Sequence, residues 1–242
     1  MNVAHLIPRI PSITRFARVP VPLTNEATYV LDVAGTEWVA KREADMGYQA
    51  LLAEALTWLL ARAIGVRVPD AAFCDDPAER AWLSRRVPDA THWTATAVTG
   101  VANVAEAPAI LALDAIVLNE ARHGGNILMS TDGTTSGVTV WAIDADEARV
   151  GHVQEYAAAD LAVPDPRILA SGFPGSDWHP NALVAADQAT RLSRSTLDAL
   201  VQEACAVARE TNMGILAQKL AHRCAHAVEL TVEYTLRVEA RR

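Results

Sequence analysis

A lysine and a glutamate early in the chain are spaced as a phosphate-binding pair would be. Lys41 closes the segment Val39-Ala40-Lys41 at the end of an expected strand, and Glu54 follows thirteen residues later in an expected helix. A strand-end lysine can reach nucleotide phosphates, and a fixed carboxylate holds its flexible stem in place. Glu54 interrupts the apolar run LLAEALTWLL, where a buried carboxylate requires a cationic partner. The alternative is a solvated Glu54 beside an ordinary strand-end lysine.

Two possible oxygen ligands for a metal lie farther along the chain. Asn126 follows the loop Asn119–Gly125, and Asp144 ends the apolar strand expected at 138–143. If the strands expected at 126–130 and 138–143 pair around the turn TDGTTSG, these side chains meet at the open end of a hairpin. Amide and carboxylate oxygens suit Mg²⁺. The alternatives are a surface turn around Asn126 and an aspartate that merely caps a strand.

The elements expected around these residues form a small antiparallel sheet followed by helices. A hairpin over 28–33 and 37–42, a helix over 46–64, and strands over 71–74 and 80–87 follow a segment at 1–24 that is either an irregular arm or an edge strand. A polar stretch at 88–105 marks a lobe boundary, and a helix over 108–118 follows it. Residues 144–185 are expected to be a long loop, followed by a helix starting at Ser195 and another over 215–240. The fold class is α+β.

Composition excludes several classes of protein. The chain has 242 residues, of which 51% are hydrophobic and 21% charged, so it can bury a sizeable core. Its net charge of −8 opposes direct nucleic-acid binding. Three cysteines without paired spacing predict no disulfide framework, and the absence of a long apolar run predicts a cytoplasmic protein without a membrane span.

The order strand lysine, helix glutamate, loop asparagine and strand-end aspartate is that of kinases. With VAKR (39–42), LLAEALTWLLARAIGVRVPD (51–70), LDAIVLNEARHGGNIL (113–128) and WAID (141–144), the chain resembles the HipA-like serine/threonine kinases. The resemblance is to their short stand-alone members, whose motifs are similar to those of phosphatidylinositol 3/4-kinases. It implies a bilobal protein-kinase-like fold, with an N-lobe over 1–88 and a C-lobe over 89–242.

The resemblance also implies a role for each motif residue. Lys41 would contact ATP phosphates and Glu54 would pair with it, while Asn126 and Asp144 would bind Mg²⁺. The backbone from Leu83 to Val87, including Ser84 and Arg85, would bind adenine, and Arg122 and His123 would brace the catalytic loop. The expected activity is phosphoryl transfer to Ser or Thr of a protein substrate by a toxin-type growth regulator, with an antitoxin as a possible partner.

Two departures from the family pattern matter. Ala121 stands where the family has the catalytic aspartate, and a methyl group cannot orient a substrate hydroxyl or accept its proton. Either the chain is a natural pseudokinase that senses nucleotide, or its sequence was altered on purpose at this position; the intact remaining site favours the second. The stretch VPVPLTNEA has no glycine, so a phosphate-covering loop there would use Thr24, Asn25 and backbone N–H groups. A lipid or small-molecule kinase is a further alternative.

Other residues have weaker interpretations. His222 and His226, with Cys224 between them, have a spacing that can bind zinc, but no third ligand is evident. Ser171 and Ser176 could be phosphorylated or could be ordinary loop residues. Trp178 and His179 could line a substrate groove or anchor their loop. The helix expected at 215–240 is interpreted first as core packing and second as a dimer or antitoxin interface.

Overall fold

The N-terminal part of the chain forms a six-stranded sheet. The computed structural model describes residues 6–18, 27–93, 106–131, 138–167 and 178–241. The strands are β1 (Arg9–Ile10), β2 (Ile13–Arg18), β3 (Ala27–Asp32), β4 (Glu37–Arg42), β5 (Ala71–Cys74) and β6 (Ala81–Arg85), in the order β1-β5-β6-β4-β3-β2. Only the β1–β5 pair is parallel. The predicted hairpin is β3–β4, and the predicted strands at 71–74 and 80–87 are β5 and β6.

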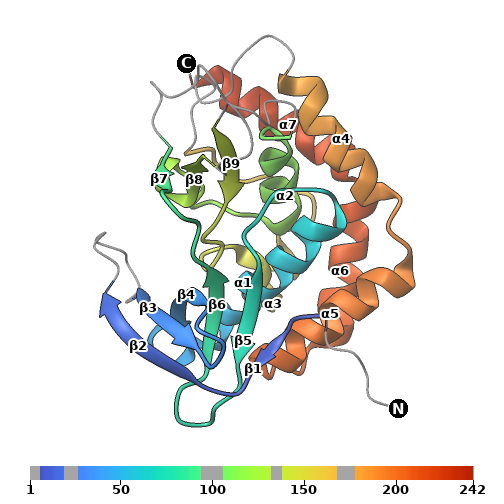
Figure 1. Cartoon of the computed structure of the whole chain (residues 1–242). Coiled ribbons are helices and arrows are strands. Elements are labelled where there is room, and N and C mark those ends of the chain that lie inside the picture. Colours follow the sequence, from blue (N-terminus) through green and yellow to red (C-terminus); the bar gives the residue numbers. More distant parts are fainter. Residues whose placement is uncertain (1–5, 19–26, 94–105, 132–137, 168–177, 242) are drawn as a thin grey trace.

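Helix α1 (Glu43–Ala63) is buried on all sides along its middle. Every residue from Leu51 to Ala61 is buried, as the broad apolar surface of this segment predicted. The helix packs against the sheet strands β4 and β6 on one side and against the C-terminal helix α5 (Arg194–Ala208) on another. Figure 1 shows α1 (cyan) between the sheet and the C-terminal helices. Its position therefore depends on both ends of the chain.

A second, three-stranded sheet lies above the first in Figure 1, in the order β7-β8-β9. It consists of β7 (Thr91–His92), β8 (Ile127–Ser130) and β9 (Thr139–Ala142), and Ile127 is opposite Ala142. This confirms the hairpin predicted around residues 131–137. Helix α2 (Ala109–Val117), predicted at 108–118, is wholly buried and ends at Leu118, which has a left-handed backbone conformation. The lobe boundary at 88–89 stays a prediction.

The prediction of a long loop over 144–185 is wrong. The described residues include the 3₁₀ turn η3 (Arg149–Gly151), helix α3 (Val153–Ala158) and the start of helix α4 (Trp178–Thr190). Helix α3 has only six residues and buries only Val153 and Tyr156. Its sequence is therefore too short to show a repeated apolar period. The buried face of α4 after Trp178 consists of alanines, which give a weak hydrophobic signal.

Two predictions for the C-terminal helices also need correction. Helix α5 begins after Ser193, whose Oγ accepts a hydrogen bond from Thr196 N at 3.1 Å, so Ser193 and not Ser195 is the N-cap. The helix predicted over 215–240 is two helices, α6 (Met213–Ala225) and α7 (Ala227–Ala240), which meet at His226. None of the helices among the described residues has the length and apolarity that crossing a bilayer requires.

Candidate active site

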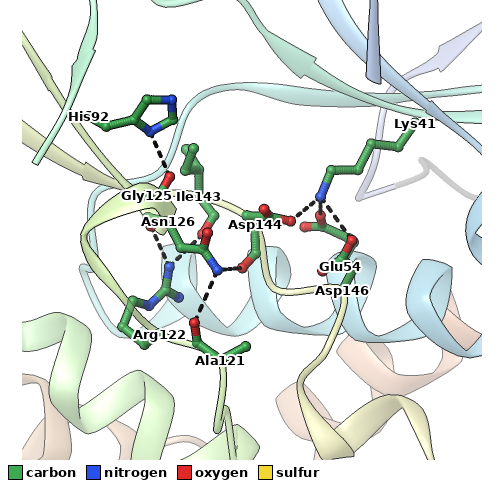
Figure 2. Close-up of polar contacts among 10 residues, drawn as sticks. All are labelled: Lys41, Glu54, His92, Ala121, Arg122, Gly125, Asn126, Ile143, Asp144 and Asp146. Carbon is green, nitrogen blue, oxygen red and sulfur yellow. Dashed lines mark hydrogen bonds and ion pairs between the residues drawn. The ribbon is translucent and has the colours of Figure 1, made fainter. Parts of the chain in front are cut away.

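Lys41 lies at the centre of a cluster of three carboxylates (Figure 2). Its Nζ lies 2.6 Å from Glu54 Oε1 and 3.3 Å from Asp146 Oδ2, and it also donates to Asp144 Oδ1. The four side chains are between 7 and 17% exposed. Strand β4 supplies the lysine, α1 supplies Glu54, and the segment after β9 supplies both aspartates, so three distant parts of the sequence meet here.

Burial and mutual charge shift the pKa values of Lys41, Asp144 and Glu54. Burial lowers the pKa of Lys41, but the three carboxylates outweigh it and hold the pKa above its ordinary value. Burial raises the pKa of Asp144, but Lys41 outweighs it and the carboxyl's pKa lies below its usual range. Burial raises the pKa of Glu54 in spite of Lys41. With all four groups ionised, the cluster carries two net negative charges, which a divalent cation would balance.

Asn126 lies beside Asp144, directly before strand β8. Its Nδ2 donates to Ala121 O at 3.3 Å and to Asp144 O at 3.5 Å, which fixes the plane of the amide. Asp144 has a φ of 58°, a left-handed conformation that aspartate tolerates better than most residues. The chain therefore turns sharply after Ile143, and the carboxylate faces Lys41 (Figure 2). The structure thus brings together Lys41, Glu54, Asn126 and Asp144, as the sequence predicted.

Arg122 ties the loop before Asn126 to its surroundings. Its Nε lies 3.0 Å from Asp114 Oδ2, and these two side chains are only 1 and 0% exposed. One terminal nitrogen donates to the carbonyls of Asn126, itself a predicted metal ligand, and of Ile143, which directly precedes the other predicted ligand, Asp144. His123 is exposed, and its Nδ1 accepts a hydrogen bond from Gly125 N at 3.0 Å. Arg122 therefore contacts the loop as a brace would, whereas His123 caps the turn η2 (Gly124–Asn126).

A cavity of about 310 Å³ opens onto the Lys41 cluster. Strands β3 and β4 line one side, and Leu128 and Ile143 line the other. Ser84 and Arg85 line it from the end of strand β6, and Arg86 and Val87 line it from the start of the segment that leads to the second sheet. The Leu83 side chain is fully buried with the apolar residues of the first sheet and does not line the cavity. Thr24 and Asn25 lie outside the described residues.

Ala121 provides no acid or base beside Asn126. It is buried, and its N donates to Asn119 Oδ1 at 3.0 Å. The neighbouring Glu120 pairs with Arg149 at 3.0 Å, so its carboxylate is directed to that guanidinium.

Sequence reasoning assigned no role to Asp114 and Asp146. The pattern Ile-Asp-Ala-Asp-Glu contained a signal for Asp146, since a second acid two residues after Asp144 can reach the same lysine. Asp114 lies within the apolar run of α2, where a buried carboxylate requires a partner.

The weaker interpretations have the following outcomes. Among the described residues, the only group of three suitably placed metal-ligating side chains is Glu54, Asp144 and Asp146, which leaves the zinc site without support. His222 instead pairs with Asp160 at 3.3 Å, His226 pairs with Glu229 at 2.8 Å, and Cys224 is buried. Trp178 is buried and His179 pairs with Glu239 at 3.2 Å, which favours an anchor over a substrate groove. Ser171 and Ser176 lie outside the described residues.

Structural similarity identifies the fold. Scans against protein-family models and against curated proteins give no match. The structure is similar to the Helicobacter pylori proinflammatory kinase CtkA, with a TM-score of 0.61 and 8% identity over 96% of this chain and 98% of that chain. The chain has a HipA-like kinase fold. It is also similar to HipA of Shewanella oneidensis MR-1, solved with HipB and operator DNA, with a TM-score of 0.51 and 13% identity over 90% of this chain and 67% of HipA.

This result confirms the α+β, bilobal kinase-like fold predicted from the sequence. In this fold the motif residues Lys41, Glu54, Asn126 and Asp144 lie at or next to the cavity. In kinases a lysine binds the phosphates and pairs with a glutamate that positions it, while an asparagine and an aspartate hold metal.

Proposed function

We propose that the chain binds ATP with Mg²⁺ in the cavity beside Lys41 and has the architecture of a HipA-like Ser/Thr kinase. The observation that carries the proposal is the convergence of Lys41, Glu54 and Asp144 at that cavity, with Asn126 adjacent. Lys41 would bind the phosphates, and Glu54 would hold Lys41 in place. The backbone from Ser84 to Val87, which includes the end of strand β6, would contact the adenine.

The donor set fits magnesium. Asn126 offers an amide oxygen and Asp144 a carboxylate. When Lys41 and its three carboxylate partners are all ionised, the cluster carries a net charge of two negative units. Bound there, Mg²⁺ would neutralise charge on the phosphates. Asp144 contacts Lys41 directly, so one carboxylate oxygen would have to be shared with the metal or released to it. Asp146 and Glu54 would then keep Lys41 in position, which gives Asp146 a role beside the predicted site residues.

The chemistry supported by this arrangement is in-line transfer of the γ-phosphate to a hydroxyl. Transfer depends mainly on positioning and charge stabilisation, which the four motif residues supply. The group that would orient the acceptor hydroxyl is missing at Ala121, and Glu120 is engaged with Arg149. We therefore propose that this form binds nucleotide and transfers phosphate slowly.

The proposed acceptor is a Ser or Thr hydroxyl of a protein, in a toxin-type growth regulator with an antitoxin partner. Its support is the fold shared with HipA, which has been solved in complex with HipB. Mass spectrometry of the phosphorylated product would distinguish protein from lipid and small-molecule acceptors. Ala121 favours a second candidate, a pseudokinase that binds nucleotide and controls a partner without turnover.

Calorimetric titration with ATP, with and without Mg²⁺, tests the shared part of both candidates. We expect binding that Mg²⁺ strengthens and that Asp144→Asn makes insensitive to Mg²⁺. A wild-type chain that binds no ATP under either condition would contradict the proposed function. Retained Mg²⁺ enhancement in Asp144→Asn would contradict the assignment of the metal ligand.

A further inference from the structure

The turn η3 lies between the helix that carries Glu54 and the loop that leads to Asn126. On the side of α1 it approaches so closely that a Cβ at Gly151 would clash with Gln49 O and would lie 2.9 Å from Ala53 Cβ. Real Cβ atoms do not come this near to a backbone oxygen, so the approach requires glycine. Ala53 directly precedes Glu54, and the contact therefore lies beside the lysine's partner.

The same turn is fixed on its other side to the loop that follows α2. Arg149 N donates to Leu118 O at 3.1 Å, and Arg149 Nη2 pairs with Glu120 Oε2 at 3.0 Å. Between these contacts and Gly151, Val150 is fully buried. The turn also follows Asp144 and Asp146 closely in sequence, and Ala148 N donates to Ala145 O at 3.0 Å. Helix α1, which carries Glu54, and the loop that leads to Asn126 therefore both contact the short turn η3.

We infer that Gly151 and Arg149 are positioning residues that set the distance between α1 and the metal-binding loop. The inference rests on the proposed function, because the groups positioned are those that would bind Mg²⁺ and ATP. Since α1 is held by η3 on one side and by α5 on another, the Lys41–Glu54 pair is built into the fold. Its formation then does not wait for phosphorylation or a partner to move the helix.

Gly151→Ala, with Gly214→Ala as its matched control, tests the approach to α1. A Cβ at Gly214 would meet nothing within 4 Å, so this change adds the same methyl group in open space. Overpacking at Gly151 should displace η3 and lower the affinity for ATP with Mg²⁺ about tenfold or more, while Gly214→Ala should leave it unchanged. Calorimetry with and without Mg²⁺ and a circular-dichroism melt are the measurements. A folded Gly151→Ala protein with wild-type affinity would overturn the inference.

Because Gly151→Ala could prevent folding, a second pair of variants tests the other side. Arg149 and Glu120 are 40 and 38% exposed, so Arg149→Gln and Glu120→Gln should leave the melting temperature nearly unchanged. Each should weaken Mg²⁺-dependent ATP binding by about threefold, and the double variant should lose no more than either single one. Lower melting temperatures with unchanged affinity would mean a merely structural pair and would overturn the inference. A wild-type chain without ATP binding contradicts the proposed function, on which the inference depends.

Discussion

Arg122 and Asp114 form an ion pair that is almost completely removed from solvent, with Arg122 Nε 3.0 Å from Asp114 Oδ2. Asp114 belongs to α2, and the other end of the guanidinium holds the carbonyls of Asn126 and Ile143. One arginine therefore joins a buried helix to both strands of the hairpin that carries the candidate metal ligands. Asn119 Nδ2 also donates to Asp114, at 3.1 Å.

Asp114→Ala should reduce the free energy of unfolding by about 3–5 kcal/mol, because it leaves the buried charge of Arg122 without a partner. Urea unfolding monitored by circular dichroism measures this. Asp198→Ala is the control, since Asp198 pairs with Arg194 at 2.9 Å but both side chains are about half exposed. The control should lose only about 0–1 kcal/mol. Equal losses in the two variants would show that burial does not determine the cost.

Asp146→Asn should weaken the binding of ATP with Mg²⁺ but keep its dependence on Mg²⁺. The reason is that Asp146 contacts Lys41 at 3.3 Å and is proposed to hold this lysine when Asp144 binds metal. We expect a loss of about three- to tenfold, in line with one charge-assisted hydrogen bond. The measurement is calorimetric titration of Asp146→Asn and of Asp144→Asn with ATP, with and without Mg²⁺. Asp144→Asn should lose the Mg²⁺ effect. The same Mg²⁺-independent binding in both variants would make Asp146 a metal ligand rather than a positioning residue.

Ala121→Asp should increase phosphoryl transfer by about 10²–10⁴-fold, because it supplies a carboxylate that can orient a hydroxyl and accept its proton. Autophosphorylation and ATP turnover on cell extract are the measurements. Ala121→Asn is the control, as it adds a side chain of similar size without a base. A wild-type rate in Ala121→Asp would count against the kinase proposal and in favour of a pseudokinase.

In Asp144→Asn the free energy of unfolding should fall less steeply than in the wild type as the pH is lowered. Burial alone would raise the pKa of Asp144, but Lys41 lowers it below the 3.8 of an ordinary aspartate. A group with a lowered folded-state pKa stabilises the protein above its unfolded-state pKa, and this contribution is lost as the pH falls through the folded-state value. Denaturant unfolding between neutral pH and about pH 3 measures the difference. A steeper acid loss in the variant than in the wild type would contradict this sign.

Cys205 and Cys224 should resist maleimide labelling in the folded protein. Burial raises the pKa of each thiol to about 12, so the reactive thiolate is scarce at neutral pH. Mass spectrometry should find these two cysteines unlabelled in buffer and labelled in urea. Rapid labelling in buffer would mean that the helices α5 and α6 open frequently.

The sequence predicted the elements whose apolar pattern is strong. The hairpin that ends at Lys41, the helix around Glu54 and the hairpin between Asn126 and Asp144 all lie where they were predicted. Each is either continuous and apolar or flanked by a glycine turn, so local pattern and tertiary packing agree. Lys41, Glu54 and Asp144 line one cavity and Asn126 lies next to Asp144, as expected from the order of the elements that carry them.

The parts that sequence reasoning missed depend on contacts between distant segments. Helix α3 contributes little more than Val153 and Tyr156 to the core, and α4 buries mostly alanine, so neither has a clear period. The break at His226 lies within an apolar pattern that continues on both sides. The role of Asp114 becomes visible only when Arg122, eight residues later, folds back onto it.

The burial of α1 has a consequence for synthesis of the chain. Its leucine-rich middle is covered by α5, and Glu203 of that helix holds Arg9 at 2.9 Å and receives a hydrogen bond from Ile7 N at 3.4 Å. Glu203 is synthesised 194 residues after Arg9, so helix α5 becomes available long after the N-terminal segment that it holds. The nascent chain therefore exposes the apolar middle of α1 until α5 has been synthesised, and a chaperone that shields this segment should improve the yield of native protein.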